Sequence, residues 1–279
     1  MKNFTLVILL LFSIYASAQK EANNWYFGNR AGIQFQEDGS VIALSGSSMN
    51  TTEGCSAISD INGNLLFYTD GRKVWDKNHI QMIGLGQNFQ MQGDPSSTQS
   101  GIIVPKLDNP DIYYVFTVDE PHHENAATYP LPFPGPYEDG NTVPEDDDGM
   151  NNGLAFYVID MSITGSNGSD GDFIPNTGGF GLNTYNSLDP VESSYKCSEK
   201  ITAVKKADGT GHWIITHFID KFYAFMTGDP TSANYNVSTV PVVSQVLYHY
   251  QDTEEILLAV LRHRRMALSL LLPTCKEEQ

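Results

Sequence analysis

The sequence predicts an all-β fold in the form of a partial β-propeller-like array of small antiparallel sheets, with a β-sandwich as the alternative. The composition is rich in aromatic residues, Gly, Asn, Asp, Ser and Thr, and long helix-forming stretches are absent before about residue 245. Tight-turn pairs such as Asn62-Gly63 and Asp70-Gly71 separate short apolar segments. A unit of strand, turn, aromatic strand, turn and strand recurs along the chain, as expected of propeller blades.

The beginning of the chain has the features of a secretory signal peptide. Lys2 precedes an apolar run over residues 6–12, and an Ala-Ser-Ala cleavage sequence ends at Ala18. The run is about half the length that a membrane-spanning helix needs. We therefore expect residues 1–18 to be a signal peptide, cleaved before Gln19. The mature chain is then exported through the inner membrane and has no transmembrane segment.

The predicted β-domain covers residues 19–245 and begins with a hairpin. A first short strand is expected at 24–28, and apolar and polar residues alternate over 32–35. A polar Glu-Asp-Gly-Ser turn follows, and residues 41–44 form the returning strand.

Three copies of the repeated unit follow this hairpin, each with an aromatic strand at its centre. The predicted strands are 55–60, 65–69 and 73–76 in the first copy, 101–105, 112–117 and 154–159 in the second, and 200–205, 212–217 and 221–225 in the third. Small antiparallel sheets repeated in this way are typical of propeller blades.

Two long segments inside the domain are expected to be loops. Residues 120–152 are rich in proline and contain an acidic run, so they cannot pack a core. Residues 162–189 are rich in Gly, Asn and Ser, which favour turns over regular structure.

The last segment, residues 246–279, differs in character from the rest of the chain. Its Leu, Glu, Ala and Arg content predicts a helix at about 253–272, with Thr253 as its cap. Back-translated and shifted in frame, residues 250–272 can instead encode a strand, an Asp-Gly turn and an apolar strand. This alternative reading frame favours the hypothesis that a frameshift truncated a longer propeller. The predicted helix would then be a product of the frameshift and not a native element of the propeller.

The charge of the chain excludes some partners. A formal net charge of −17 argues against nucleic acid, because the chain has too few cations to neutralise phosphates. Such a balance suits an extracellular protein and leaves room for bound calcium.

Asp60, Asn62 and Asn64 resemble the start of a calcium-binding loop. The bidentate Glu that should follow is missing at the required spacing, and Asn62-Gly63 is already explained as a hairpin turn. These three residues are therefore weak calcium candidates, and calcium is the one cofactor that the sequence suggests.

The three cysteines, Cys55, Cys197 and Cys275, are too few for a disulfide framework. One bridge between Cys55 and Cys197 is open to an exported protein, and two unpaired, buried thiols are the favoured alternative.

No nucleophile elbow, phosphate-binding loop or dinucleotide fingerprint occurs in the sequence, and we predict no catalytic residue. The His-His-Glu sequence at 122–124 lacks the spacing of a helical zinc site. Glu53, Asp70 and Asp94 would supply an acid and a base for glycoside hydrolysis only if two of them lay about 5–10 Å apart in a cleft.

Four aromatic residues are candidates for stacking on sugar rings, namely Trp25, Tyr26, Trp75 and Trp213. Aromatic residues at strand positions more often form the core of the fold, so this second interpretation is favoured.

A combination of motifs carries a family resemblance. The motifs are residues 24–28 (NWYFG), 52–55 (TEGC), 64–71 (NLLFYTDG), 93–100 (GDPSSTQS) and 197–204 (CSEKITAV). Over about residues 23–245 the chain resembles the amino-terminal domain of large secreted proteins of flavobacteria and other Bacteroidetes. Many of those proteins end in a type B, gliding-motility-related sorting domain of type IX secretion.

The resemblance implies a propeller-like extracellular or cell-surface domain with secretion machinery as a partner, and it implies no catalytic residues. The sorting domain is absent here, so we expect the precursor as written to reach the periplasm. The leading hypothesis is a non-enzymatic binding or adhesion module for a surface glycan or protein. The alternatives are a carbohydrate-active enzyme or glycan-binding domain, and a truncated fragment without function.

Overall fold

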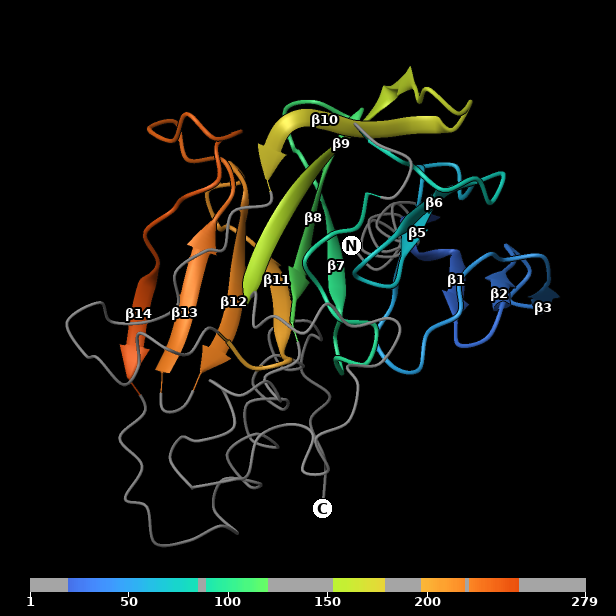
Figure 1. Ribbon diagram of the computed structural model, residues 1–279, viewed down its shortest axis with the longest axis horizontal. Helices are drawn as coiled ribbons and strands as arrows, with labels where there is room; N and C mark the ends of the chain where they lie inside the picture. The colour runs from blue at the N-terminus through green and yellow to red at the C-terminus, as the bar shows by residue number, and fades with distance from the viewer. Residues whose placement is uncertain (1–19, 85–88, 120–152, 179–196, 219–220, 246–279) are drawn as a thin grey trace, which may run out of the picture. The chain divides into compact units, whose positions relative to one another are not determined.

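The sheets of this protein follow one another along the chain, and each is built from consecutive strands that pair antiparallel (Figure 1). The computed structural model describes residues 20–84, 89–119, 153–178, 197–218 and 221–245. Within these residues the all-β prediction is confirmed, with four small sheets of which none closes into a barrel. The predicted leader, the predicted loop at 120–152 and the tail with its predicted helix lie outside the described residues.

Every strand that the sequence predicts is present in the structure, which adds β10 and β14 and a short 3₁₀ turn at Lys20–Ala22. The first sheet contains β1 (Asn24–Phe27), β2 (Ala31–Phe35) and β3 (Val41–Leu44), and the second contains β4 (Ser56–Ser59), β5 (Leu65–Thr69) and β6 (Val74–Asp76). The third sheet contains β7 (Gly101–Pro105), β8 (Ile112–Val118), β9 (Leu154–Thr164) and β10 (Asp170–Gly178). The fourth contains β11 (Ile201–Lys205), β12 (His212–Phe218), β13 (Lys221–Met226) and β14 (Val242–Gln245).

Strand β10 corrects the prediction for residues 162–189. The sequence predicts a loop over these residues, and this prediction is wrong for the end of β9 and for β10. Residues 179–189 lie outside the described part of the chain. A tight turn between Gly165 and Ser169 folds the chain back, and β10 pairs with β9 in an irregular register. The Asp172 carboxylate then accepts the N–H of Gly84 at 2.8 Å, and Gly84 lies in the segment that follows β6 of the second sheet. Tertiary contacts thus stabilise a strand in a sequence of weak strand preference.

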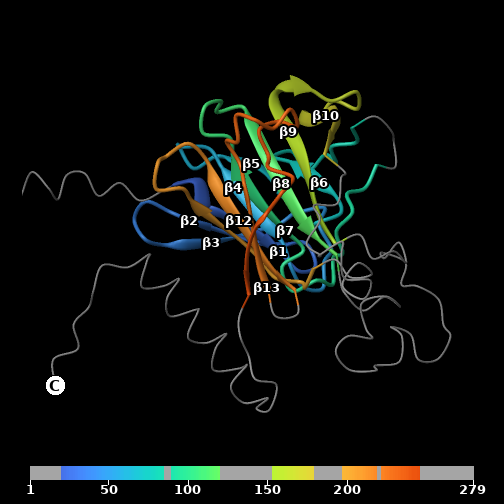
Figure 2. The ribbon, with the colours of Figure 1, turned by 90° about the vertical axis from the view of Figure 1, so that its left-hand side faces the viewer.

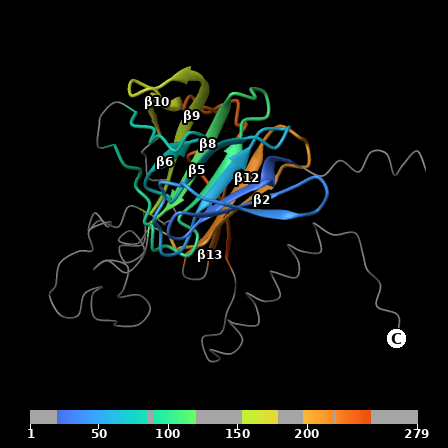
Figure 3. The ribbon, with the colours of Figure 1, turned by 90° about the vertical axis from the view of Figure 1, so that its right-hand side faces the viewer.

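Adjacent sheets pack face to face in chain order. The first strands of successive sheets lie in contact, β1 with β4, β4 with β7 and β7 with β11. Each contact between sheets encloses its own core cluster, so the described domain has three cores in series. Figures 2 and 3 view this series from the side of the last sheet and from the side of the first sheet, respectively.

The core between the first and second sheets is aromatic. Tyr26 of β1 stacks on Tyr68 of β5 with ring centroids 4.6 Å apart, and Tyr68 stacks on Trp75 of β6 at 5.4 Å. The Tyr68 hydroxyl accepts the N–H of Ser48 at 3.0 Å and lies 3.0 Å from Nδ1 of His79. The polar atom of this buried ring is therefore satisfied.

The third sheet packs against a neighbouring sheet on each of its faces. One face, which includes Val115 and Tyr157, packs on Phe67 and Val74 of the second sheet. The other face, which includes Phe116, packs on Phe225 of the fourth sheet. All seven residues of β8 are buried, as expected of a strand between two packed layers.

Candidate functional site

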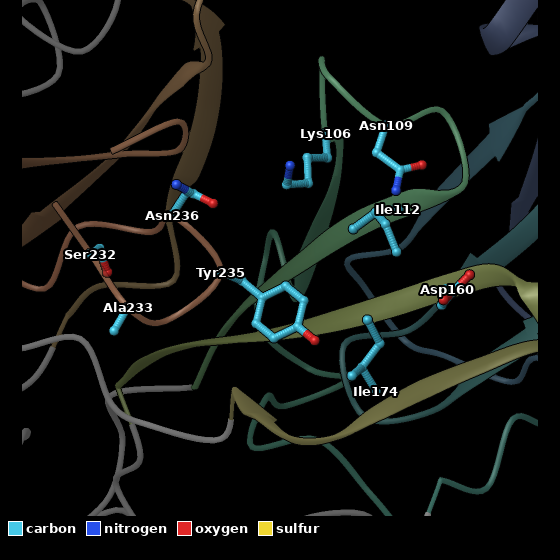
Figure 4. Close-up of a pocket in the computed structure, with 9 residues that line it drawn as sticks. All are labelled: Lys106, Asn109, Ile112, Asp160, Ile174, Ser232, Ala233, Tyr235 and Asn236. Carbon is cyan, nitrogen blue, oxygen red and sulfur yellow. The ribbon is translucent and has the colours of Figure 1, made fainter. Parts of the chain in front are cut away.

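The candidate site is an open pocket at one end of the third sheet, beside the loop that follows β13 (Figure 4). Its volume is about 460 Å³. The pocket is lined by Lys106, Asn109, Ile112, Asp160, Ile174, Ser232, Ala233, Tyr235 and Asn236. A cavity of this size accommodates a small ligand or one segment of a polymer.

One wall of the pocket is the loop from Asp229 to Val237. The Asp229 carboxylate accepts the backbone N–H and the hydroxyl of Thr231 at 2.9 and 2.7 Å. The Asp229 N–H donates to the carbonyl of Asn236 at 2.8 Å, and the Asn236 amide donates back to the Asp229 carbonyl at 3.1 Å. These reciprocal bonds close the loop on itself and fix the backbone that carries Tyr235.

The tip of this loop has an uncommon backbone conformation. Tyr235 and Asn236 have φ angles of 50° and 61°, and the Val237 N–H donates to the Asn234 carbonyl at 3.0 Å. Two successive positive φ angles inside a turn of this kind favour Asn-Gly, whereas an aromatic residue there costs about 1–2 kcal/mol. A strained aromatic residue in a pocket wall is a reason to look for function at that residue.

Tyr114 of β8 holds this strained turn from the core. Its hydroxyl donates to the carbonyl of Tyr235 at 2.8 Å, although the Tyr114 ring is itself almost fully buried. Burial raises the pKa of Tyr114 far above its ordinary value, so the hydroxyl keeps the proton that it donates. The position of the Tyr235 backbone is therefore coupled to the third sheet.

The opposite wall is the turn between β7 and β8. The Asn109 N–H donates to the Lys106 carbonyl at 3.1 Å, and Lys106 forms an ion pair with Asp108. The Asn109 side-chain oxygen accepts the N–H of Asp111 at 3.1 Å. The backbone of this turn thus presents the Asn109 amide nitrogen and the Lys106 ammonium group at the rim.

The remaining wall is formed by β9 and β10. One carboxylate oxygen of Asp160 accepts the N–H and the hydroxyl of Ser162 at 2.8 and 2.6 Å. Ile112 and Ile174 add apolar surface beside the Tyr235 ring, which Figure 4 shows between the loop and these strands. The pocket therefore combines an aromatic face, an apolar surface and a polar rim.

Several polar groups at the pocket make no hydrogen bond within the described part of the chain. They are the Tyr235 hydroxyl, the Asn236 side-chain oxygen, the Asn109 amide nitrogen and the second Asp160 oxygen. Donors and acceptors beside an aromatic ring suit a ligand that has many hydroxyl groups and an apolar ring face. Asp160 is the one carboxylate among the described lining residues, so they do not supply an acid and base pair.

The calcium candidates lie in the turn between β4 and β5 and do not line this pocket. One Asp60 oxygen accepts the N–H groups of Asn62 and Asn64 at 2.8 and 2.9 Å, and the other accepts the Asn64 amide at 2.9 Å. The carboxylate thus closes the hairpin turn. The described residues contain no group of three or more His, Cys, Asp or Glu side chains placed to hold a metal ion. Calcium binding at Asp60 stays a prediction.

The cysteine pair is not bridged. No disulfide joins Cys55 and Cys197, both of which lie in the described part of the chain. Cys55 packs against the core between the first two sheets, whereas Cys197 belongs to the core between the third and fourth. Burial, with a smaller effect from Asp70, raises the pKa of the Cys55 thiol, which makes it a poor nucleophile.

The three carboxylates considered for glycoside hydrolysis do not line the pocket. Glu53 is exposed in the chain before β4, whereas Asp70 and Asp94 are buried. Asp70 closes the turn before β6 by accepting the N–H groups of Arg72 and Lys73 at 2.9 and 2.7 Å. Asp94 accepts the N–H and hydroxyl of Ser96 at 2.7 and 2.6 Å. Both of these buried residues therefore stabilise turns.

The predicted aromatic candidates divide into two groups. Tyr26 and Trp75 are buried, so the core interpretation is confirmed for them. Trp25 is 51% exposed on the first sheet, and Trp213 is half-buried on the fourth. Neither of these two lines the pocket.

The motifs that carry the family resemblance connect neighbouring sheets. The hydroxyl of Thr52 donates to the Pro95 carbonyl at 3.4 Å, and Thr98 donates its N–H and hydroxyl to the Glu199 carboxylate at 2.9 and 2.6 Å. At Gly54 a Cβ atom would lie 2.2 Å from the backbone nitrogen of Ser100, so only glycine fits this close approach. These residues have a structural role in the described domain.

The pocket residues were not predicted from the sequence. Lys106 and Asn109 lie in the turn between β7 and β8 and Asp160 lies within β9, and chain folding alone brings them together. One signal was present, because Tyr235 lies between two asparagines, which favour turns with positive φ.

Comparisons of this chain with protein-family models, curated proteins and solved structures found no match. Among the described residues there is no helix whose length and apolar character would let it cross a bilayer.

Proposed function

We propose that this protein is a non-enzymatic, extracellular binding module whose pocket at Tyr235 takes a hydroxyl-rich ligand, such as a segment of a surface glycan. The observation that carries the proposal is the Tyr235 turn. It holds an aromatic ring at the pocket through a strained backbone and a buried hydrogen bond from Tyr114. The ring lies beside one Asp160 oxygen, the Asn236 side-chain oxygen and the Asn109 amide nitrogen, which make no hydrogen bond in the described part of the chain.

The aromatic ring and the polar rim have complementary roles in this proposal. The apolar face of a sugar ring stacks on Tyr235, and its hydroxyl groups bond to Asn109, Asp160 and Asn236. The pocket is open to solvent, so a polymer can pass through it without its ends being enclosed.

Binding to a glycan array, followed by calorimetry with the glycans that are retained, tests this function. We expect Tyr235→Ala to weaken binding about 10-fold or more, since stacking contributes about 0.5–1.5 kcal/mol beyond the burial of area. Ile61→Ala is the control, because Ile61 is an exposed apolar residue in the turn between β4 and β5 that does not line the pocket, and this variant should bind normally. Equal binding by both variants contradicts the proposal, and release of reducing ends from a retained polysaccharide would favour an enzyme.

The export route belongs to the same proposal. A charged start, an apolar run and a small-residue cleavage site support removal of residues 1–18. Expression in a bacterium with an outer membrane should yield a mature chain that begins at Gln19, as determined by amino-terminal sequencing. Ala18→Arg should block cleavage, because the peptidase admits only small residues at that position. A mature chain that still begins at Met1 would contradict this part of the proposal.

A further inference from the structure

The first sheet has an exposed apolar outer face. Tyr26 of β1 points toward the second sheet, so its neighbours Trp25 and Phe27 point the other way, and Trp25 is opposite Ile33 in the register of β1 and β2. In the same way Phe35 is opposite Val41. We call Trp25, Phe27, Ile33, Phe35 and Val41 the leading face. Trp25 and Val41 are each 51% exposed, and the rings of Trp25 and Phe35 lie edge to face at 5.4 Å.

The fourth sheet has a matching face at the other end of the series. Ile214 and Phe225 point toward the third sheet, so the alternate residues point outward. Val204, Trp213 and Met226 lie side by side across β11, β12 and β13, and Ile215 and Ala224 form the next row. We call these five residues the trailing face. Val204 is 49% exposed, and Trp213, Ile215, Ala224 and Met226 are half-buried.

These two faces lie at the two ends of the series of sheets that the described residues form. Wherever two successive sheets meet, a face of the earlier sheet packs on a face of the later sheet, and the two faces enclose an apolar core. The leading face is therefore shaped to receive the sheet that would come before β1, and the trailing face is shaped to receive one after β14. If the trailing face of a second copy packs on the leading face, the two sheets meet in the same way as successive sheets do within the chain.

Charge at the rims of the two faces is of opposite sign. Asp38 is exposed in the turn between β2 and β3, beside the leading face, and its neighbour Glu37 is exposed there in an ion pair with Lys20. Lys200 and Lys205 are exposed at the two ends of β11, beside the trailing face, and they have no ion-pair partner in the described part of the chain. Opposite charges at the rim favour a leading face against a trailing face over two leading faces together.

We propose that the leading face of one copy of this chain binds the trailing face of a second copy. The contact is heterologous, since it joins two different surfaces. Two such contacts close a pair of copies into a ring if the rotation allows it, and otherwise the copies form longer assemblies. The occupant of each face is thus a sheet of the same protein.

Sedimentation velocity of the purified protein over a range of concentrations tests the contact. Two double variants each remove one face: Trp25→Thr with Val41→Thr, and Val204→Thr with Trp213→Thr. Threonine keeps the strand preference of these positions, and circular dichroism melting checks that each variant is folded. We expect the unaltered chain to associate as its concentration rises, and each double variant alone to remain monomeric.

Mixing the two double variants is the decisive measurement. Each variant keeps the face that the other has lost, so the mixture should form one heterologous contact and sediment as a dimer. Association should persist at high salt, because the apolar contact is retained when the net charge of −17 is screened. A chain that stays monomeric at all concentrations overturns the proposal. So does a leading-face variant that still self-associates, or a mixture that gains no dimer.

Discussion

The third sheet and the first sheet both contain strands with apolar and aromatic residues, yet the structure buries them to different extents. The third sheet packs on both faces and its strand β8 is wholly buried, whereas the first sheet packs on one face and exposes Trp25 and Val41 on the other. The difference shows that the apolar character of a strand does not determine its burial. Position in the series of sheets does, because an inner sheet has two neighbours and an end sheet has one.

A pair of phenylalanine truncations gives the largest expected effect. Phe116→Ala in β8 should lower the free energy of unfolding by about 3–5 kcal/mol, because it leaves a cavity in a core packed from both sides. Phe27→Ala in β1 removes the same atoms from an exposed position and should cost about 1 kcal/mol or less. Urea denaturation of both variants measures the difference, and equal losses would contradict the contrast between the two sheets.

A second comparison concerns strain in the loop after β13. Tyr235→Ala and Tyr235→Gly both remove the ring, but only glycine adopts a φ of 50° without strain. The glycine variant should therefore be more stable than the alanine variant by about 1 kcal/mol. In the same loop Ala233 has an ordinary φ, so Ala233→Gly should be neutral or destabilising. Thermal melting of the three variants checks this, and an alanine variant as stable as the glycine one would argue against strain at Tyr235.

The smallest expected effect is on the pH dependence of stability, and it comes from the buried or hydrogen-bonded carboxylates in the two turns of the second sheet. Burial raises the pKa of Asp70 above its ordinary value of 3.8, against hydrogen bonds from the Lys73 and Arg72 backbone that lower it. A raised pKa in the folded state means that the folded protein binds the proton more tightly. Asp70 therefore opposes folding above its folded pKa, and this cost disappears as the pH falls below 3.8. Asp70→Asn should stabilise the protein at neutral pH and leave acid stability unchanged.

Asp60 is the matched control with the opposite sign. Slight burial raises its pKa, but hydrogen bonds from Asn64, Asn62 and Gly63 outweigh this and lower the pKa overall. Its contribution to stability is present above 3.8 and is lost as the pH falls through its folded pKa. Asp60→Asn should therefore destabilise the protein at neutral pH. Urea denaturation at several pH values tests both variants, and the same sign for both would show that the carboxylate environments are not as described.

Most strands and turns of this fold can be predicted from the sequence, because the residue patterns that indicate them are local. Alternation over β2 and the Asn62-Gly63 turn depend only on neighbouring residues, and both are present as expected. Strand β10 was missed because its partner β9 and the distant Gly84 stabilise it, rather than its own residues. The candidate site was missed for the same reason, since Asn109, Asp160 and Tyr235 meet only after three segments have packed together.

The contact of β1 with β4, β4 with β7 and β7 with β11 has a consequence for how the chain acquires its structure. Each sheet needs only the one made just before it as a template, so order can spread from the amino-terminal end while later residues are still being synthesised. Most pairings join strands that are close in sequence, so they close short loops and form quickly, whereas the pairing of β8 with β9 must bring Val118 and Leu154 together across a longer segment. Assembly by successive addition also lets a gene gain or lose a sheet at its end without disturbing those already formed.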